Sequence, residues 1–319
     1  MLVGYGRNAK SEPFRGPETG SDNREIHVSI DSAPDSSHHS GLNSALSIHT
    51  QKAILNDVVP EKTELAARVN VLGVGVSALN LELAEQAIGR ALKEGRRGYI
   101  CVTGVHGVSE AQVDDAFRQI LNDSLLNTPD GMPMVWMGRL QGVKYMSRVY
   151  GPDLMFRVCD WTRRHGGSHF LYGGGPGVAE ELKARLEAKF PGLTIVGTHT
   201  PPFRPLNAAE ESELQARISR LKPDIIWVGL STPKQEKFMA QYLPRLETTL
   251  MFGVGAAFDF HAGRVRQAPR WMQRSGLEWF FRLCCEPRRL WKRYLKNNPL
   301  FVLRAILQLT GLKKYPLER

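Results

Sequence analysis

The sequence has few cysteines, and their spacing predicts neither a metal site nor a disulfide framework. Four cysteines occur in 319 residues, with no C-x-x-C pair and no His/Cys ligand spacing. We therefore expect reduced thiols in a reducing compartment. A D-x-D motif is also missing, so the sequence lacks the paired carboxylates that commonly hold Mg²⁺ or Mn²⁺. No metal or other cofactor is expected.

Long apolar runs are missing as well. The N-terminus has no apolar stretch behind a basic patch, which argues against a signal peptide. No segment approaches the run of about 20 apolar residues that a transmembrane helix needs. These absences indicate a cytoplasmic protein, and any contact with a membrane should be peripheral.

Three regions differ in composition. Residues 1–62 are poor in apolar side chains and contain stretches such as DSAPDSSHH (31–39), so we expect a disordered leader there. Residues 63–270 read as an α/β core. Residues 271–319 form a basic tail, which we expect to be a helical, amphipathic appendage.

Within the core, short β-branched runs alternate with stretches of helical period. The first pair, VNVLGVGVS (69–77) and LELAEQAIGRALKE (81–94), reads as a strand followed by a helix. Five further runs are YICVT (99–103), HFLYGG (169–174), LTIVGT (193–198), DIIWVGL (224–230) and TLMFGVG (249–255). This alternation predicts a Rossmann-like parallel sheet covered by helices on both faces. Ligands of such sheets bind at the carboxyl ends of the strands.

A glycine-rich segment, LYGGGPGVAE (171–180), lies between a predicted strand and a predicted helix. Its glycines are Gly173, Gly174, Gly175 and Gly177. Glycines in such a turn let backbone amides approach a phosphate at the positive end of a helix. They also serve tight turns that bind nothing, so both interpretations stay open. The spacing does not match the G-x-G-x-x-G dinucleotide fingerprint.

The segment NTPDGMPMVW (127–136) places Asp130 in a turn formed by residues 128–131, just before an apolar helix. Asp and Gly suit a purely structural turn. A carboxylate in a loop beyond a strand end can also remove a proton from an attacking hydroxyl. The segment by itself does not decide between a turn residue and a general base.

The net charge of +10 belongs almost entirely to the tail and the few residues before it. Residues 263–319 hold 14 Lys and Arg against three Glu, a net charge of +11, whereas the rest of the chain sums to −1. Aromatic residues and leucines are interleaved with these cations, as in amphipathic helices that bind anionic membranes. A helix pair that buries its apolar stripe against a second copy of the chain is the alternative. Nucleic acid is a poorer fit because no reading motif is present.

Four blocks, taken in order, resemble one enzyme family. They are PDGMP, YGGGPG, GLSTPKQEKFM (229–239) and a long block over residues 253–299 that includes RWMQRSGLEWFFRLCCEPRRLWKRY. Together they resemble the WecG/TagA/CpsF glycosyltransferases from about Val69 to about Pro299. The resemblance implies inverting, metal-independent transfer from UDP-N-acetylmannosamine, its uronate or another UDP-hexose. The implied acceptor is a polyprenyl-diphosphate-linked sugar, used in exopolysaccharide or other envelope glycan assembly.

The resemblance also implies roles for single residues. The family's proposed base matches Asp130, and its donor-positioning threonine matches Thr103. An arginine beyond the PDG turn matches Arg148, and the glutamine of the TPKQE segment matches Gln235. Some members carry Asn shortly after the threonine, where this chain has His106. A sugar contact and simple packing both remain open for His106.

Transfer without a metal requires other positive groups at the departing diphosphate. Arg148 and the amides of the glycine-rich turn are candidates for this role. Glu236 is a candidate acceptor for a ribose or sugar hydroxyl, or simply a first-turn acid of a helix. Four tail arginines are expected to meet the acceptor's diphosphate and the inner face of the plasma membrane. They are Arg282, Arg288, Arg289 and Arg293.

Two other classes of function remain as alternatives. One is a nucleotide-binding regulatory module without catalysis, and the other is an NAD-dependent oxidoreductase that uses the glycine-rich turn. The sequence does not identify the donor sugar, the acceptor glycan or the oligomeric state, although a homo-oligomer is compatible with the tail.

Overall fold

The structure is a computed structural model that describes residues 65–317. The predicted leader, residues 1–62, lies outside the described residues, so its expected disorder stays a prediction.

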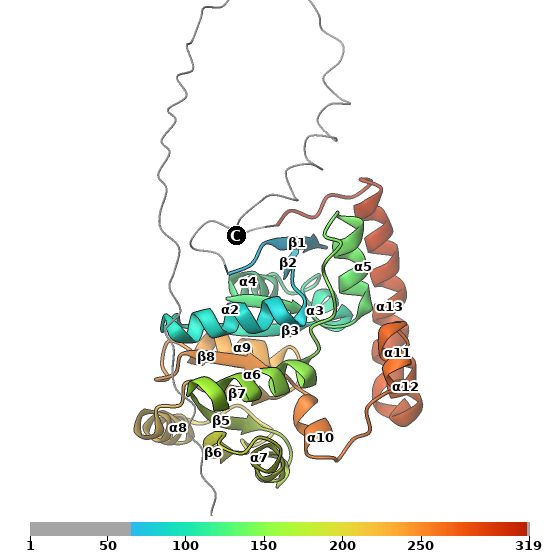
Figure 1. The fold of residues 1–319 in the computed structure, drawn as a ribbon. Coiled ribbons are helices and arrows are strands. Elements are labelled where there is room, and N and C mark those ends of the chain that lie inside the picture. The colour runs from blue at the N-terminus through green and yellow to red at the C-terminus, as the bar shows by residue number, and fades with distance from the viewer. Residues whose placement is uncertain (1–64, 318–319) are drawn as a thin grey trace, which may run out of the picture. The chain divides into compact units, whose positions relative to one another are not determined.

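A six-stranded parallel sheet forms the centre of the fold, in the order β4-β3-β8-β7-β5-β6 (Figure 1). The strands are β3 (Gly98–Thr103), β4 (Leu126–Pro129), β5 (Ser168–Gly173), β6 (Thr194–His199), β7 (Ile225–Gly229) and β8 (Leu250–Gly253). Their registers bring the carboxyl ends to one edge: Thr103 lies opposite Pro129, and Gly173 lies opposite Gly229. The five runs predicted as strands between residues 99 and 255 are strands of this sheet.

Helices cover both faces of the sheet, as predicted. One face carries α2 (Leu81–Lys93), α6 (Gly151–His165), α7 (Val178–Lys189) and α10 (Ala257–His261). The other carries α3 (Val105–Glu110), α4 (Asp115–Asp123), α8 (Ala208–Leu221) and α9 (Lys234–Tyr242). The chain thus leaves β3 toward one face and its neighbour β8 toward the other. Loops that diverge between adjacent strands leave a crevice where such sheets bind ligands.

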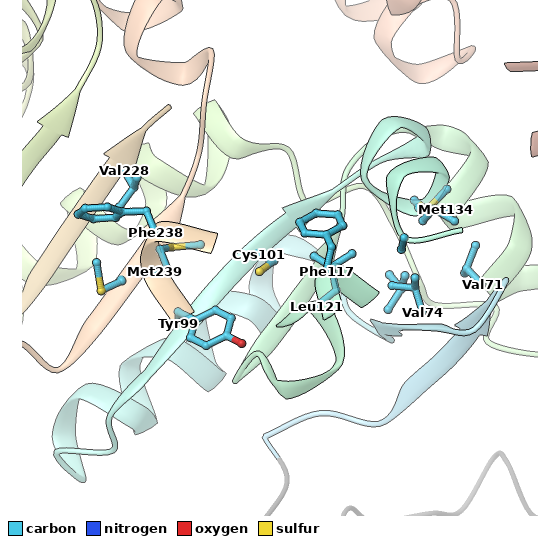
Figure 2. Close-up of a cluster of buried hydrophobic side chains, with 14 of the residues drawn as sticks. Val71, Val74, Tyr99, Cys101, Phe117, Leu121, Met134, Val228, Phe238 and Met239 are labelled. Carbon is cyan, nitrogen blue, oxygen red and sulfur yellow. The ribbon is translucent and has the colours of Figure 1, made fainter. Parts of the chain in front are cut away.

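The core on the second face holds α4 and α9 against the sheet (Figure 2). Phe117 and Leu121 are one helical turn apart on α4, and both are fully buried. Phe238 and Met239 of α9 meet Val228 in the same cluster. Each such side chain stabilises the fold by about 1.5–3 kcal/mol on burial. This packing fixes the helices that carry the strand-end loops.

The first predicted strand is instead a hairpin outside the main sheet. β1 (Arg68–Val71) and β2 (Val74–Ser77) pair antiparallel. Leu72 and Gly73 both have positive φ, 54° and 82°, and form the two-residue turn between them. The Asn70 side chain accepts a hydrogen bond of 2.8 Å from the Gly73 amide. The prediction of one continuous strand was wrong because a central Gly inside an apolar run allows this reversal.

The PDG turn begins later than predicted. Thr128 and Pro129 belong to β4, so the turn consists of Asp130 and Gly131 before α5 (Met132–Leu140). β4 is short and polar, and tertiary contacts stabilise it: the Asn127 amide donates to Ser77 Oγ at 3.0 Å. Asp130 accordingly lies directly at a strand end.

The tail forms three helices, α11 (Arg270–Arg274), α12 (Glu278–Cys285) and α13 (Pro287–Leu309). We call residues 271–317 the appendage. Leu290, Asn297, Phe301 and Ala305 form the buried stripe of α13, which packs against α3. Its other face exposes residues such as Leu295 and Leu303. Within residues 65–317, no helix is both long and apolar enough to cross a membrane.

Candidate active site

The ends of β3 and β4 bring Thr103 and Asp130 together. The Asp130 amide donates to the Thr103 carbonyl at 2.9 Å. A Cβ on Gly104 would lie 2.9 Å from the Asp130 carbonyl oxygen, so the close approach of these two loops requires Gly at position 104. The buried Thr103 hydroxyl has no hydrogen-bond partner.

The Asp130 carboxylate lies between solvent and protein. A third of the side chain remains accessible, while Oδ1 is buried without a hydrogen-bond partner. Burial raises the pKa of Asp130 to about 6, against the lowering effect of Arg148. A carboxylate with this pKa is largely ionised at neutral pH and is a stronger base than an ordinary Asp.

Arg148 is held from three sides. Its Nη2 pairs closely with Glu278 of α12 and lies 3.6 Å from Asp130 Oδ1. Its Nη1 donates to Gln273 of α11 at 3.4 Å. The guanidinium carbon lies 3.8 Å from the centroid of the Tyr150 ring. The buried Nε has no partner.

Gln235 and Glu236 lie in the first turn of α9, after β7, and both are buried. Glu236 Oε1 accepts from Thr232 Oγ1 at 2.9 Å and from Gln235 Nε2 at 3.0 Å. Glu236 Oε2 and Gln235 Oε1 have no partners. Burial raises the pKa of Glu236. These side chains therefore place two buried oxygens without hydrogen-bond partners at the strand ends.

The glycine-rich turn connects β5 to α7, and several of its positions have no room for a side chain or adopt a backbone conformation that favours glycine. Gly173, Gly174 and Gly177 have positive φ, and Gly177 caps α7. A Cβ on Gly173 would lie 2.7 Å from the backbone of Gly229. The Gly174 amide donates to the Gly229 carbonyl at 2.9 Å. Packing of β5 against β7 therefore explains part of this turn, and phosphate binding by the turn, including Gly175, stays a prediction.

His106 connects the core to the appendage. Its Nδ1 lies 3.2 Å from Asn297 Nδ2 of α13 and 3.5 Å from Glu110. Burial lowers the pKa of His106, and the neighbouring Arg293 lowers it further. Both effects favour the neutral imidazole, which packs at the joint between α3 and α13. Its contact with a sugar stays a prediction.

The structure divides the four tail arginines into two pairs. Arg282 lies near Asp130. Burial raises the pKa of that carboxyl and has the larger effect, whereas Arg282 lowers the pKa. Arg293 lies near His106, and the Nε atoms of Arg282 and Arg293 are buried without partners. Arg288 and Arg289 are exposed, and Arg289 pairs with Glu286. Arg282 and Arg293 are therefore the two of these arginines that have buried, unpartnered nitrogens.

Unpartnered polar atoms concentrate at this edge. Within residues 65–317, eleven side chains bury a polar atom that lacks a hydrogen-bond partner, and eight of them line this region. The oxygens belong to Thr103, Asp130, Tyr150, Gln235 and Glu236, and the nitrogens belong to Arg148, Arg282 and Arg293. Buried polar groups are normally satisfied, so such a concentration indicates a site for a polar ligand. The core supplies the acceptor oxygens, and the appendage adds two cations.

Three residues near the site were not predicted from the sequence: Tyr150, Gln273 and Glu278. Glu278 carried the only available signal, because it is one of three acids among 14 cations in residues 263–319. Its partner Arg148 lies 130 positions away, so spacing alone could not identify the pair.

Comparisons with known proteins agree with the earlier resemblance. Residues 69–315 match the Glycosyl transferase WecG/TagA/CpsF family. A Bacillus subtilis (strain 168) protein is 31% identical over 193 residues, which cover 60% of this chain and 73% of that protein. A Bacillus spizizenii (strain ATCC 23059 / NRRL B-14472 / W23) protein is 30% identical over 186 residues, 58% of this chain and 70% of that protein. Both relatives are named N-acetylglucosaminyldiphosphoundecaprenol N-acetyl-beta-D-mannosaminyltransferase.

Proposed function

We propose a sugar-transfer reaction for this chain, which belongs to the WecG/TagA/CpsF glycosyltransferase family. In the proposed reaction, a hexose or N-acetylhexosamine moves from a UDP-sugar to a polyprenyl-diphosphate-linked sugar. The two relatives are named for an acceptor of that kind. The observation that carries the proposal is that the core contributes buried oxygens without hydrogen-bond partners, while Arg282 and Arg293 of the appendage contribute buried nitrogens without partners. Sugar hydroxyls suit the former, and a diphosphate suits the latter.

In the proposed reaction, Asp130 takes the proton of the acceptor hydroxyl as that oxygen attacks C1 of the donor sugar. The bond between C1 and the β-phosphate oxygen breaks, and UDP leaves with the electron pair. A direct displacement of this kind inverts the configuration at C1. Thr103, Gln235 and Glu236 are the proposed acceptors for hydroxyl groups of the donor.

The charge that develops on departing UDP needs stabilisation by fixed positive groups. Arg148 Nε, Arg282 Nε and Arg293 Nε are buried cationic donors, and such preorganised groups act strongly in a site with little water. Within residues 65–317, no group of three or more His, Cys, Asp or Glu is arranged to hold a metal. We therefore propose that transfer needs no divalent metal and proceeds in the presence of EDTA.

The appendage also bears the proposed membrane contact, at the cytoplasmic face of the plasma membrane. Trp271, Trp291, Leu295 and Leu303 are exposed on α11 and α13. Exposed cations, such as Arg288 and Lys292, lie between these residues in the sequence. Apolar side chains mixed with cations bind anionic bilayers by insertion and charge together. A contact with a second copy of the chain is the competing use of this surface.

Ligand-induced stabilisation separates transfer from the NAD-dependent alternative. UDP at about 100 times its dissociation constant should stabilise the fold by about 2.7 kcal/mol. For a protein of this size that corresponds to several degrees in melting temperature, on the order of 5–10 °C. NAD should produce no shift, because the dinucleotide fingerprint is missing. Differential scanning fluorimetry measures both, and a response to NAD without one to UDP would contradict the proposed donor.

A further inference from the structure

Glu278 and Asp130 compete for one nitrogen of Arg148. Nη2 forms a close ion pair with Glu278 and remains 3.6 Å from Asp130 Oδ1, which is beyond hydrogen-bond distance. Arg148 and Glu278 are both largely buried, with 13% and 14% of their side chains exposed. Two buried side chains in close charge-assisted contact have a fixed geometry. The closest partner of the arginine therefore comes from the appendage and not from the proposed base.

The remaining contacts of Arg148 point to the same arrangement. Gln273 of α11 accepts from Nη1 at 3.4 Å, and the Tyr150 ring lies against the guanidinium plane. A guanidinium without the Glu278 carboxylate would have one strong anionic partner within reach, Asp130. Arginine and carboxylate groups form paired, two-bond contacts when geometry permits. A carboxylate engaged in that way is a poor proton acceptor.

We propose that Glu278, contributed by α12 of the appendage, is a positioning residue that holds Arg148 away from a close ion pair with Asp130. This inference rests on the proposed function, in which Asp130 is the base. The appendage thereby takes part in the chemistry through the core arginine, in addition to supplying cations. A core whose appendage is undocked would have Asp130 paired with Arg148 and inactive as a base.

The groups that act on Asp130 come from two segments. Arg148 and Tyr150 lie just before the first residue of α6, whereas Glu278 and Arg282 lie on α12. Glu278 adds to the rise in the pKa of Asp130 that burial causes, whereas Arg148 and Arg282 oppose it. Removing the charge of Glu278 eliminates one group that raises the pKa of Asp130. It also frees Arg148, which lowers that pKa. Both changes act in the same direction on Asp130.

The test is a direct titration of Asp130 by carboxyl ¹³C NMR in the full chain, without substrate. Glu278→Gln should lower the pKa of Asp130 by about one to three pH units, the usual effect of a cation in close contact. Glu286→Gln is the matched control, because Glu286 lies in the appendage, pairs with the exposed Arg289 and is not among the groups that act on Asp130. It should leave the Asp130 titration unchanged.

A double-mutant cycle distinguishes positioning from a general weakening of the fold. In an Arg148→Gln background no guanidinium remains to be released, so Glu278→Gln should shift the Asp130 titration much less. Glu278→Asp should restore part of the normal titration. In transfer assays, the acid limb of the kcat profile of Glu278→Gln should move to lower pH with reduced kcat.

An Asp130 titration that is the same in the wild type and in Glu278→Gln would overturn the positioning role. An equal shift with and without Arg148 would overturn it as well. A wild-type protein that transfers no sugar, while Glu278→Gln shifts the Asp130 titration as expected, would contradict the proposed function and support the arrangement of the three side chains. The two failures are therefore distinguishable.

Discussion

Replacing Asp130 with Asn is expected to reduce sugar transfer by about 10²–10⁴-fold, the usual contribution of a positioned general base. UDP affinity should be retained, because the proposed partner of Asp130 is the acceptor hydroxyl. Asn nearly preserves the shape of the side chain and removes only its basicity and charge. Steady-state kinetics and UDP titration calorimetry measure the two effects separately.

The same substitution should raise the stability of the fold at neutral pH. The pKa of Asp130 is about 6 in the folded protein and 3.8 for an ordinary Asp, so the carboxyl lowers stability as the pH rises from about 4 to about 6, and the full cost remains above pH 6. After allowance for solvent screening at a side chain one-third exposed, the cost is on the order of 1–2 kcal/mol. Asp130→Asn should recover it as an increase of about 2–6 °C in melting temperature.

The gain in stability should have a defined pH dependence. It should be present at pH 8 and shrink as the pH falls from about 6 to about 4, because the wild-type carboxyl then becomes protonated first in the folded state and finally in the unfolded state as well. Asp160 offers a matched control on α6: hydrogen bonding to Arg163 lowers its pKa. Asp160→Asn should lower stability at neutral pH and leave transfer unchanged. A destabilised Asp130→Asn protein with normal turnover would show that Asp130 is only a turn residue.

Paired substitutions in the appendage should separate chemistry from membrane binding. Arg282→Gln with Arg293→Gln removes the two inward-facing cations and should lower kcat by about 10²-fold or more, as expected for donors at a developing anion. Vesicle binding should change little. Turnover with a short, water-soluble acceptor should fall as much as turnover with a lipid acceptor, because the leaving group is the same.

Arg288→Gln with Arg289→Gln removes the two exposed cations. Each basic residue near an anionic surface contributes about 1 kcal/mol, so binding to anionic vesicles should weaken by about tenfold or more. The binding should also be salt-dependent, since exposed charges are screened beyond a Debye length of about 8 Å at physiological ionic strength. UDP binding should be unaffected.

Vesicle flotation and analytical ultracentrifugation distinguish the two uses of the exposed surface. Unchanged vesicle binding in the Arg288 and Arg289 variant would contradict the membrane role of these residues. A monomer produced by replacing Leu295 and Leu303 with Gln would then support a contact between copies of the chain, because both leucines are exposed on α13.

Much of the sheet could be predicted because its strands are buried on both faces. DIIWVGL and YICVT are apolar runs of the kind that a covered parallel sheet requires. LNTP of β4 lacks that signal, and it is buried through contacts such as the one from Asn127 to Ser77, 50 positions away. Local composition does not contain such information.

The candidate site divides in the same way. Asp130, Thr103 and Gln235 stand in motifs beside strand ends, so the family resemblance could name them as candidates. Glu278 acts through an arginine in a different segment, and the separation of Arg282 from Arg288 depends on how α12 and α13 pack against the core. Charge counts described the appendage correctly as basic and could not indicate which of its cations face the strand ends.

The most direct test of the account is the identification of the transfer product. Purified full-length protein would be incubated in EDTA with a panel of UDP-sugars, including UDP-N-acetylmannosamine, its uronate and UDP-glucose. A polyprenyl-diphosphate-linked N-acetylglucosamine in vesicles would be the acceptor. The account predicts a lipid-linked disaccharide with inverted configuration at C1 and one UDP released per sugar transferred, both lost in Asp130→Asn. UDP release without a lipid product, or product formed only with added divalent metal, would contradict it.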